Sequence, residues 1–174
     1  MAVAEIGDKT QLLSLVLAAR FRRPWPIVAA IAVATLLNHA IAAGVGTWVT
    51  AHVPATTLRW VLGLSFIAMA GWALVPDKLD EQPGAATRFG VFATTLVAFF
   101  LAEMGDKTQV ATVALAAQQG VFLAVVAGTT LGMLIANVPV VFLGERITRK
   151  LPLRAIRIVA AVLFAAMGVF VLLR

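Results

Sequence analysis

The sequence predicts an all-α polytopic membrane protein with six transmembrane helices, arranged as two inverted three-helix repeats. Three observations lead to this fold class. The mean hydropathy is +0.98 and 61% of the residues are hydrophobic, whereas a soluble domain of 174 residues would be far more charged than 13%. Apolar runs long enough to span a bilayer alternate with short polar ones. One polar motif occurs twice, once in each half of the chain.

The apolar runs give the predicted helices in order. We expect these helices at residues 1–19, 26–50, 57–75, 89–118, 120–143 and 155–173. The first run is short on one side, because only four residues precede Glu5, whereas an apolar lead-in from Phe89 to Ala102 precedes Glu103. We therefore expect helix 1 to be truncated at its N-terminal side, with its true start further upstream.

The repeated motif divides the chain into two halves. The hexapeptide EIGDKT at residues 5–10 recurs 98 residues later as EMGDKT at residues 103–108. Each copy is followed by the rest of its helix, a short loop and two further apolar runs. The sequence thus predicts a first three-helix repeat at 1–76, a cytoplasmic linker at 77–88 and a second, inverted repeat at 89–174. The linker combines proline, glycine and mixed charge, as a solvated loop does.

The charges of the loops predict the orientation of the two halves. Three spans is an odd number, so the second half inserts upside down relative to the first. The loop between the first and second helices is basic, and the equivalent loop between the fourth and fifth is uncharged. The loop between the fifth and sixth helices is also basic, and its equivalent between the second and third is uncharged. The basic residues are Arg20, Arg22, Arg23, Arg146, Arg149, Lys150 and Arg154. By the positive-inside rule, the 1–2, 3–4 and 5–6 connections are cytoplasmic and both chain ends lie outside. Secondary transporters commonly share this plan, with their sites at the repeat interface.

Each motif places ionisable groups within a predicted span. The polar residues are Glu5, Asp8, Lys9, Thr10 and Gln11 in the first copy, and Glu103, Asp106, Lys107, Thr108 and Gln109 in the second. On a continuous helix Glu5 and Asp8 share one face, and Lys9 is close enough to Glu5 to pair with it. An ionised side chain at the bilayer centre costs roughly 2.5–3.5 kcal/mol on insertion scales, so these groups must pair or face water.

Brought together about a pseudo-two-fold axis, the two motifs form an oxygen-rich cage. Four carboxylates and two ammonium groups leave a formal charge of −2, which a divalent cation would neutralise. Oxygen ligands suit Mg²⁺, Ca²⁺ and Mn²⁺, whereas zinc and copper are poor candidates in a chain with two histidines and no cysteine. We expect the metal ligands to be Glu5, Asp8, Gln11, Glu103, Asp106 and Gln109, with Lys9, Thr10, Lys107 and Thr108 in support. The alternative is that each motif is a salt bridge that holds helices together.

Two asparagines are secondary candidates. Asn38 lies 33 residues after Glu5, and Asn137 lies 34 residues after Glu103, so both amides could return to the same site. An interhelical hydrogen bond explains the two amides equally well. His39, in the middle of the second predicted helix, is expected to pack beside the site rather than to bind the metal.

Several other functions do not fit the sequence. The net charge of +6 does not indicate a nucleic-acid partner, because the basic residues cluster in short loops between apolar runs. The GDKT sequence lacks the first glycine and the preceding strand of a phosphate-binding loop. An aspartyl-phosphate enzyme would need a soluble nucleotide domain, for which no segment is long enough. We therefore expect a protein that is not an enzyme and has no cofactor.

The paired motifs resemble those of the GDT1 family of Mn²⁺/Ca²⁺ transporters, also called uncharacterised protein family 0016. Both E-x-G-D-K-T copies fit the family pattern, and the resemblance extends over nearly the whole chain. It implies a multi-pass protein of the bacterial inner membrane that transports divalent cations, most simply in exchange for protons. It also implies that the motif acids are the ligands of the transported ion.

The mechanism we expect is alternating access around the two motifs. Acids in a low-dielectric site resist ionisation, so protons and the metal compete for the same carboxylates and their fluxes are coupled. Three alternatives remain open: a channel for the same ions, an exporter of cationic metabolites, and a membrane assembly protein that transports nothing. The sequence does not choose between Mn²⁺ and Ca²⁺, and it does not give the oligomeric state.

Overall fold

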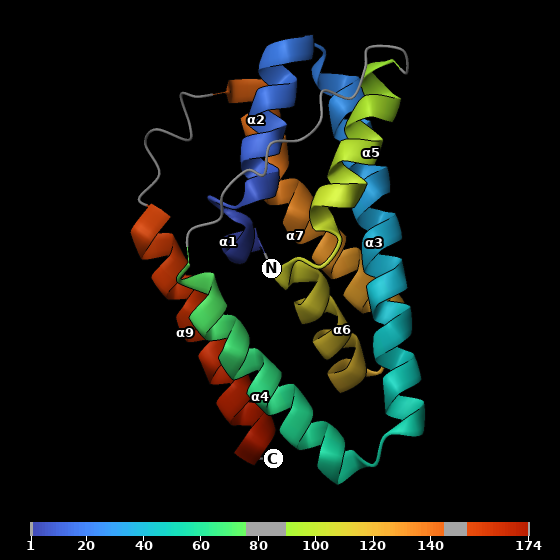
Figure 1. Ribbon diagram of the computed structural model, residues 1–174, viewed down its shortest axis with the longest axis vertical. Helices are drawn as coiled ribbons and strands as arrows, with labels where there is room; N and C mark the ends of the chain where they lie inside the picture. The colour runs from blue at the N-terminus through green and yellow to red at the C-terminus, as the bar shows by residue number, and fades with distance from the viewer. Residues whose placement is uncertain (1, 76–89, 145–152, 174) are drawn as a thin grey trace.

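A computed structural model describes residues 2–75, 90–144 and 153–173, which form helices and no strand (Figure 1). The all-helical part of the predicted fold class is therefore confirmed. In chain order the helices are α1 (Ala2–Glu5), α2 (Lys9–Phe21), α3 (Pro24–His52), α4 (Ala55–Ala73), α5 (Val91–Glu103), α6 (Lys107–Gln119), α7 (Phe122–Leu143) and α9 (Leu153–Leu173). The predicted linker at 77–88 and the loop cations Arg146, Arg149 and Lys150 lie outside the described residues.

Two predicted helices are each broken into two at the repeated motif. The run at 1–19 forms α1 and α2, and the run at 89–118 forms α5 and α6. The prediction of continuous helices through the motifs was therefore wrong. The cause is local: Gly7 and Gly105 adopt φ values of 83° and 73°, a left-handed conformation that ends a helix and favours glycine.

The aspartate of each motif then starts the next helix. Asp8 and Asp106 occupy the N-cap positions of α2 and α6 in extended conformation, with ψ of 167° and 161°. Aspartate is among the residues preferred at this position. As a consequence, Glu5 and Asp8 do not share the face of one helix; the glutamate ends one helix and the aspartate begins another.

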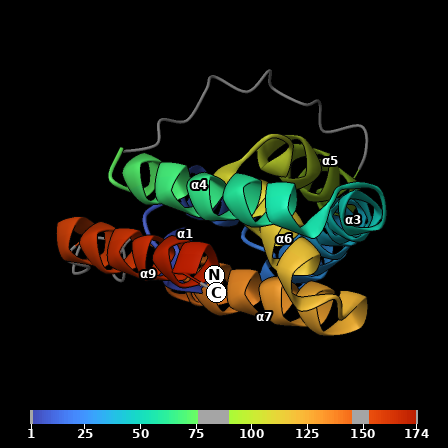
Figure 2. The same cartoon turned by 90° about the horizontal axis from the view of Figure 1, so that it is seen from below.

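Among the described residues, the helices α3 and α7 are long and apolar enough to cross a membrane. They contact each other, and each also packs against the broken helices of the opposite half: α5 and α6 lie against α3, whereas α1 and α2 lie against α7. Figures 1 and 2 show α4 and α9 running side by side next to this group. The two breaks are thereby brought toward the middle of the molecule.

Close contact between α4 and α9 depends on a pair of glycines. A β-carbon placed on Gly168 would lie 2.8 Å from the carbonyl oxygen of Gly63 and 2.8 Å from the side chain of Ile67. Small residues at such crossings allow helix backbones to approach closely, as they do between membrane helices. This pair of helices therefore depends on the absence of a side chain at the crossing.

Polar residues are inside and large apolar residues are outside. The side chains of Gln11, Asn38 and Asn137 are at most 3% exposed, whereas Ile135 is 66% exposed and Val162 is 61% exposed. Many other large apolar side chains are also exposed along these helices. A soluble protein rarely exposes so much apolar surface, but a protein surrounded by lipid does. The exposed surface is therefore that of a membrane protein.

Candidate metal site

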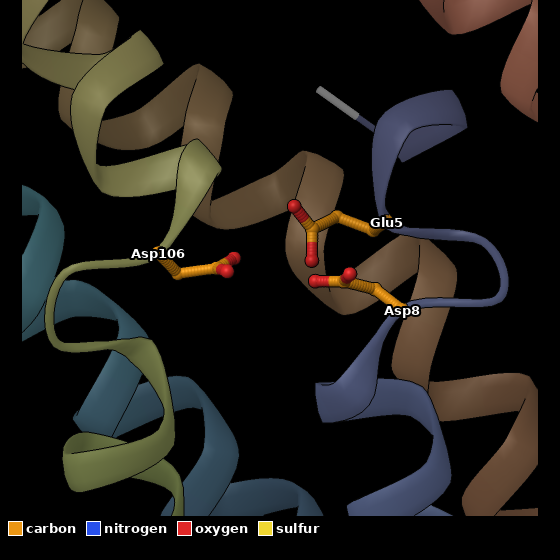
Figure 3. A group of neighbouring side chains, drawn as sticks. All are labelled: Glu5, Asp8 and Asp106. Atoms are coloured by element: carbon orange, nitrogen blue, oxygen red, sulfur yellow. The ribbon is translucent and has the colours of Figure 1, made fainter. Parts of the chain in front are cut away.

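Carboxylates from the two breaks point toward one another (Figure 3). Glu5 and Asp8 come from the turn between α1 and α2, and Asp106 comes from the turn between α5 and α6. Each offers an oxygen, and these three oxygens lie within 4.8 Å of one another. All three residues are at most 1% exposed. Three buried carboxylates at this separation can bind a single cation through oxygen.

The lysine of each motif pairs with the aspartate of the other. Lys9 Nζ lies 3.3 Å from Asp106 Oδ1, and Lys107 Nζ lies 2.6 Å from Asp8 Oδ1. The helix spacing predicted instead that Lys9 would pair with Glu5 in its own motif. The break explains the difference, because Lys9 starts α2 while Glu5 ends α1. The two reciprocal ion pairs hold the motifs together and partly neutralise their acids.

The two glutamines support the turns of their own motifs. Gln11 Oε1 accepts a hydrogen bond from the backbone N–H of Gly7, and Gln109 Oε1 accepts one from Gly105, each at 2.8 Å. Gln11 also donates through Nε2 to the carbonyl oxygen of Ala136 in α7. The amide oxygens predicted to bind metal are thus used to hold the glycine turns in this conformation. Their role as ligands stays a prediction.

In each motif, the threonine contacts the glutamate of the same motif. Thr10 Oγ1 donates to Glu5 Oε2 at 3.3 Å. Thr108 Oγ1 lies 3.4 Å from Glu103 Oε2 and 3.1 Å from Asp106 Oδ2. The other oxygen of each glutamate, Oε1, has no hydrogen-bond partner within the described part of the chain. Buried oxygens of this kind are normally satisfied, so a cation or water is the natural partner.

Glu103 is the predicted ligand that differs from the other three acids. It is fully buried, but it does not belong to the group of three carboxylates formed by Glu5, Asp8 and Asp106. Its Oε2 atom lies 3.9 Å from Nε2 of His39 in α3, a residue predicted to pack beside the site. The two halves of the site are therefore not equivalent.

The two asparagines bond to neighbouring helices. Asn38 in α3 donates to the carbonyl oxygen of Phe100 in α5 at 3.1 Å. Asn137 in α7 accepts from Ser14 in α2 at 2.8 Å and donates to the carbonyl oxygen of Met133. The bonds to Phe100 and Ser14 are interhelical, as the alternative interpretation of the two amides predicted, whereas the bond to Met133 lies within α7. Ser14 and Ala136 were not predicted, since nothing in the sequence marks a lone serine or a backbone carbonyl as a partner.

An apolar exterior around buried, cross-paired acids and lysines on broken helices is typical of membrane proteins that transport ions. Comparison with known proteins agrees with this class. Residues 1–81 and 91–174 match the family described as "Divalent cation/proton antiporter GDT1", and the chain belongs to this family. The family consists of transporters, so the expectation that the protein is not an enzyme is confirmed.

Relatives cover most of the chain. A Vibrio cholerae protein named "Putative manganese exporter" is 56% identical over 169 residues, which is 97% of this chain and 84% of that protein. The rice (Oryza sativa) protein named "GDT1-like protein 3" is 29% identical over 195 residues, covering 96% of this chain and 68% of its own length. A GDT1-like protein from Synechocystis is 26% identical, covering 94% and 88%. No solved structure matches the chain.

Proposed function

We propose that this protein exports Mn²⁺ from a bacterial cell across the inner membrane in exchange for protons. The observation that carries the proposal is the group of carboxylates from Glu5, Asp8 and Asp106, buried between the two motifs. Carboxylate oxygens suit Mn²⁺, and the family is one of divalent cation/proton antiporters. The name of the Vibrio relative supports manganese as the transported ion.

In this proposal the metal is bound between the two halves of the chain. Glu5, Asp8 and Asp106 supply oxygens directly, and Glu103 supplies its unpartnered Oε1. Lys9 and Lys107 withdraw from the aspartates as the metal enters, because the cation takes over the charge that each lysine balanced. The glutamines keep the two turns in the conformation that presents the carboxylates.

Proton coupling follows from competition for the same oxygens. When the metal leaves, buried carboxylates close to one another cannot all remain ionised without compensation, so protons replace the cation. A proton arriving at the site therefore favours release of the metal, and a metal arriving displaces protons. The two gradients are coupled because one set of carboxylates binds both kinds of ion.

The proposed transport cycle uses six spans in two inverted repeats, at 1–76 and 89–174, joined by a cytoplasmic linker at 77–88. Supporting it, each pair of broken helices packs against a long helix of the opposite half. Rocking of one half against the other would move both motifs together while the ion stays near the midplane. The reciprocal lysine–aspartate pairs would form in the empty protein and open on loading.

The test is metal flux in proteoliposomes of the purified protein. Mn²⁺ and Ca²⁺ uptake would be measured with and without an imposed pH gradient for the wild type, Asp8→Asn and Asp106→Asn. We expect Mn²⁺ flux that follows the gradient and falls at least about tenfold in both variants, the scale on which ligand environments change metal affinity. Asp80→Asn makes the same chemical change in the predicted linker and serves as the matched control.

The other outcomes point to different functions. Flux that is indifferent to the pH gradient would favour a channel. Flux of organic cations in place of metal ions would favour an exporter of cationic metabolites. Normal transport by both Asp8→Asn and Asp106→Asn would overturn the proposed site, and loss of assembly in these variants without any wild-type flux would favour an assembly protein.

A further inference from the structure

The proposed function leaves one buried histidine unused. His39 lies in the middle of α3 and has no exposed surface. Neither ring nitrogen has a hydrogen-bond partner among the residues that the structure describes. A buried polar nitrogen is normally satisfied, so an unpartnered imidazole inside a membrane helix calls for an explanation.

His39 faces Glu103, the motif glutamate that lies outside the group of three carboxylates. His39 Nε2 lies 3.9 Å from Glu103 Oε2, which is too long for a hydrogen bond. Two ligands of one divalent cation lie roughly 3 to 4.5 Å apart, given metal–ligand distances of about 2.0–2.5 Å. The separation of these two atoms therefore suits a shared metal ion better than a direct hydrogen bond. Glu103 Oε1 is also without a hydrogen-bond partner within the described chain, so the carboxylate has capacity for such an ion.

This histidine breaks the symmetry of the two halves. The matching helices begin 98 residues apart, α3 at Pro24 and α7 at Phe122, so His39 in α3 occupies the place that Asn137 has in α7. Asn137 bonds to Ser14 and Met133, whereas neither ring nitrogen of His39 has a hydrogen-bond partner among the described residues. Within the described residues, one half of the site thus offers an imidazole nitrogen beside the motif glutamate, and the other half has an amide at the matching place.

We propose that His39 Nε2 binds the transported cation together with Glu103 and thereby selects transition-metal dications over Ca²⁺ and Mg²⁺. The proposal rests on the proposed function and adds the source of its ion selectivity. Ca²⁺ and Mg²⁺ are hard cations that take oxygen ligands, whereas imidazole suits transition metals. A nitrogen ligand therefore adds affinity for Mn²⁺ that the alkaline-earth ions do not gain.

A spectroscopic test observes the bond directly. The chain has two histidines, His39 and His52, so the variant His52→Gln has a single imidazole. His52 is exposed at the end of α3, and its ring contacts the carbonyl oxygen of Trp48. The untagged His52→Gln protein would be loaded with Mn²⁺ and studied by pulsed electron paramagnetic resonance, with natural-abundance and ¹⁵N-labelled histidine. We expect a nitrogen coupling that changes on labelling.

Transport selectivity provides the second readout. In proteoliposomes, His39→Gln and His39→Asn are expected to lower the ratio of Mn²⁺ to Ca²⁺ flux by about tenfold, a typical effect of changes around a metal. His52→Gln is the matched control and should keep the wild-type ratio. Flux of Ca²⁺ in the His39 variants would show that the proteins are folded and active.

The outcomes separate this inference from the proposed function. If Mn²⁺ binds to His52→Gln and is transported, but no coupling responds to labelled histidine, His39 only packs against Glu103 and the inference is wrong while the function stands. An unchanged flux ratio in both His39 variants would also overturn it. If the wild type neither binds nor transports any divalent cation, the proposed function itself fails.

Discussion

At the scale of single residues, the central feature is the exchange of partners between the two motifs. Lys9 pairs with Asp106 and Lys107 pairs with Asp8, so each half supplies the counter-charge for the other. The sequence predicted the acids and lysines as a group but paired them within one motif. Pairing across the halves could not be predicted from spacing, because it depends on how two segments 98 residues apart meet in space.

The pair between Lys107 and Asp8 should contribute strongly to stability. Both side chains are at most 5% exposed, whereas the side chain of Lys9 is 26% exposed. Removing one partner of a buried ion pair leaves an uncompensated charge and costs about 3–5 kcal/mol. We expect Lys107→Met to lower the thermal unfolding temperature in detergent more than Lys9→Met does.

A double variant checks the physical cause of this loss. In Lys107→Met combined with Asp8→Asn, the carboxylate that Lys107 faces is no longer charged, so part of the lost stability should return. A double variant that is less stable than Lys107→Met alone would show that the lysine acts through packing and not through its charge.

At the scale of helices, most boundaries were close to those predicted, and the breaks were missed. The run at 120–143 corresponds to α7, Phe122–Leu143, and the run at 26–50 lies within α3, Pro24–His52. Hydropathy defines such helices because their whole length is apolar. The breaks are set by a glycine in left-handed conformation and a glutamine that accepts its N–H, an arrangement that no hydropathy average detects.

The break in the second motif gives a prediction for Gly105. A β-carbon there would meet nothing within 4 Å, so the cost of Gly105→Ala comes from its φ of 73°. Holding a non-glycine residue in this region costs roughly 1–2 kcal/mol. We therefore expect Gly105→Ala to lower the unfolding temperature in detergent.

The matched control is Gly71→Ala inside α4, where a β-carbon also meets nothing within 4 Å and the backbone is helical. Alanine is favoured over glycine there by about 0.5–1 kcal/mol, so this variant should be slightly more stable than the wild type. Equal effects of the two substitutions would contradict the role given to the left-handed turn.

At the scale of the whole molecule, the proposed inverted repeat makes a prediction about sidedness. If α3 and α7 cross the membrane in opposite directions, His52 at the end of α3 and Val121 before α7 face the same side. Arg22, before α3, then faces the opposite side. The charge pattern of the loops supports this assignment, because Arg22 belongs to a basic, cytoplasmic loop.

The chain has no cysteine, which makes sidedness directly measurable. Single-cysteine variants Arg22→Cys, His52→Cys and Val121→Cys would be treated in whole cells with a membrane-impermeant maleimide. We expect labelling of His52→Cys and Val121→Cys, and labelling of Arg22→Cys only after the membrane is permeabilised. Labelling of all three variants in intact cells would rule out the proposed orientation of α3.

The cross-paired lysines also have an electrical consequence. With four ionised carboxylates, the two lysines leave the site at a formal charge of −2, and either one Mn²⁺ or two protons bring it to zero. In the proposed cycle, the site loaded with one Mn²⁺ and the site loaded with two protons would then carry the same charge as they change sides. Moving one elementary charge across 100 mV is worth about 2.3 kcal/mol. A cycle that moves no net charge is unaffected by the membrane potential. The concentration gradients of metal and protons alone would then set its direction.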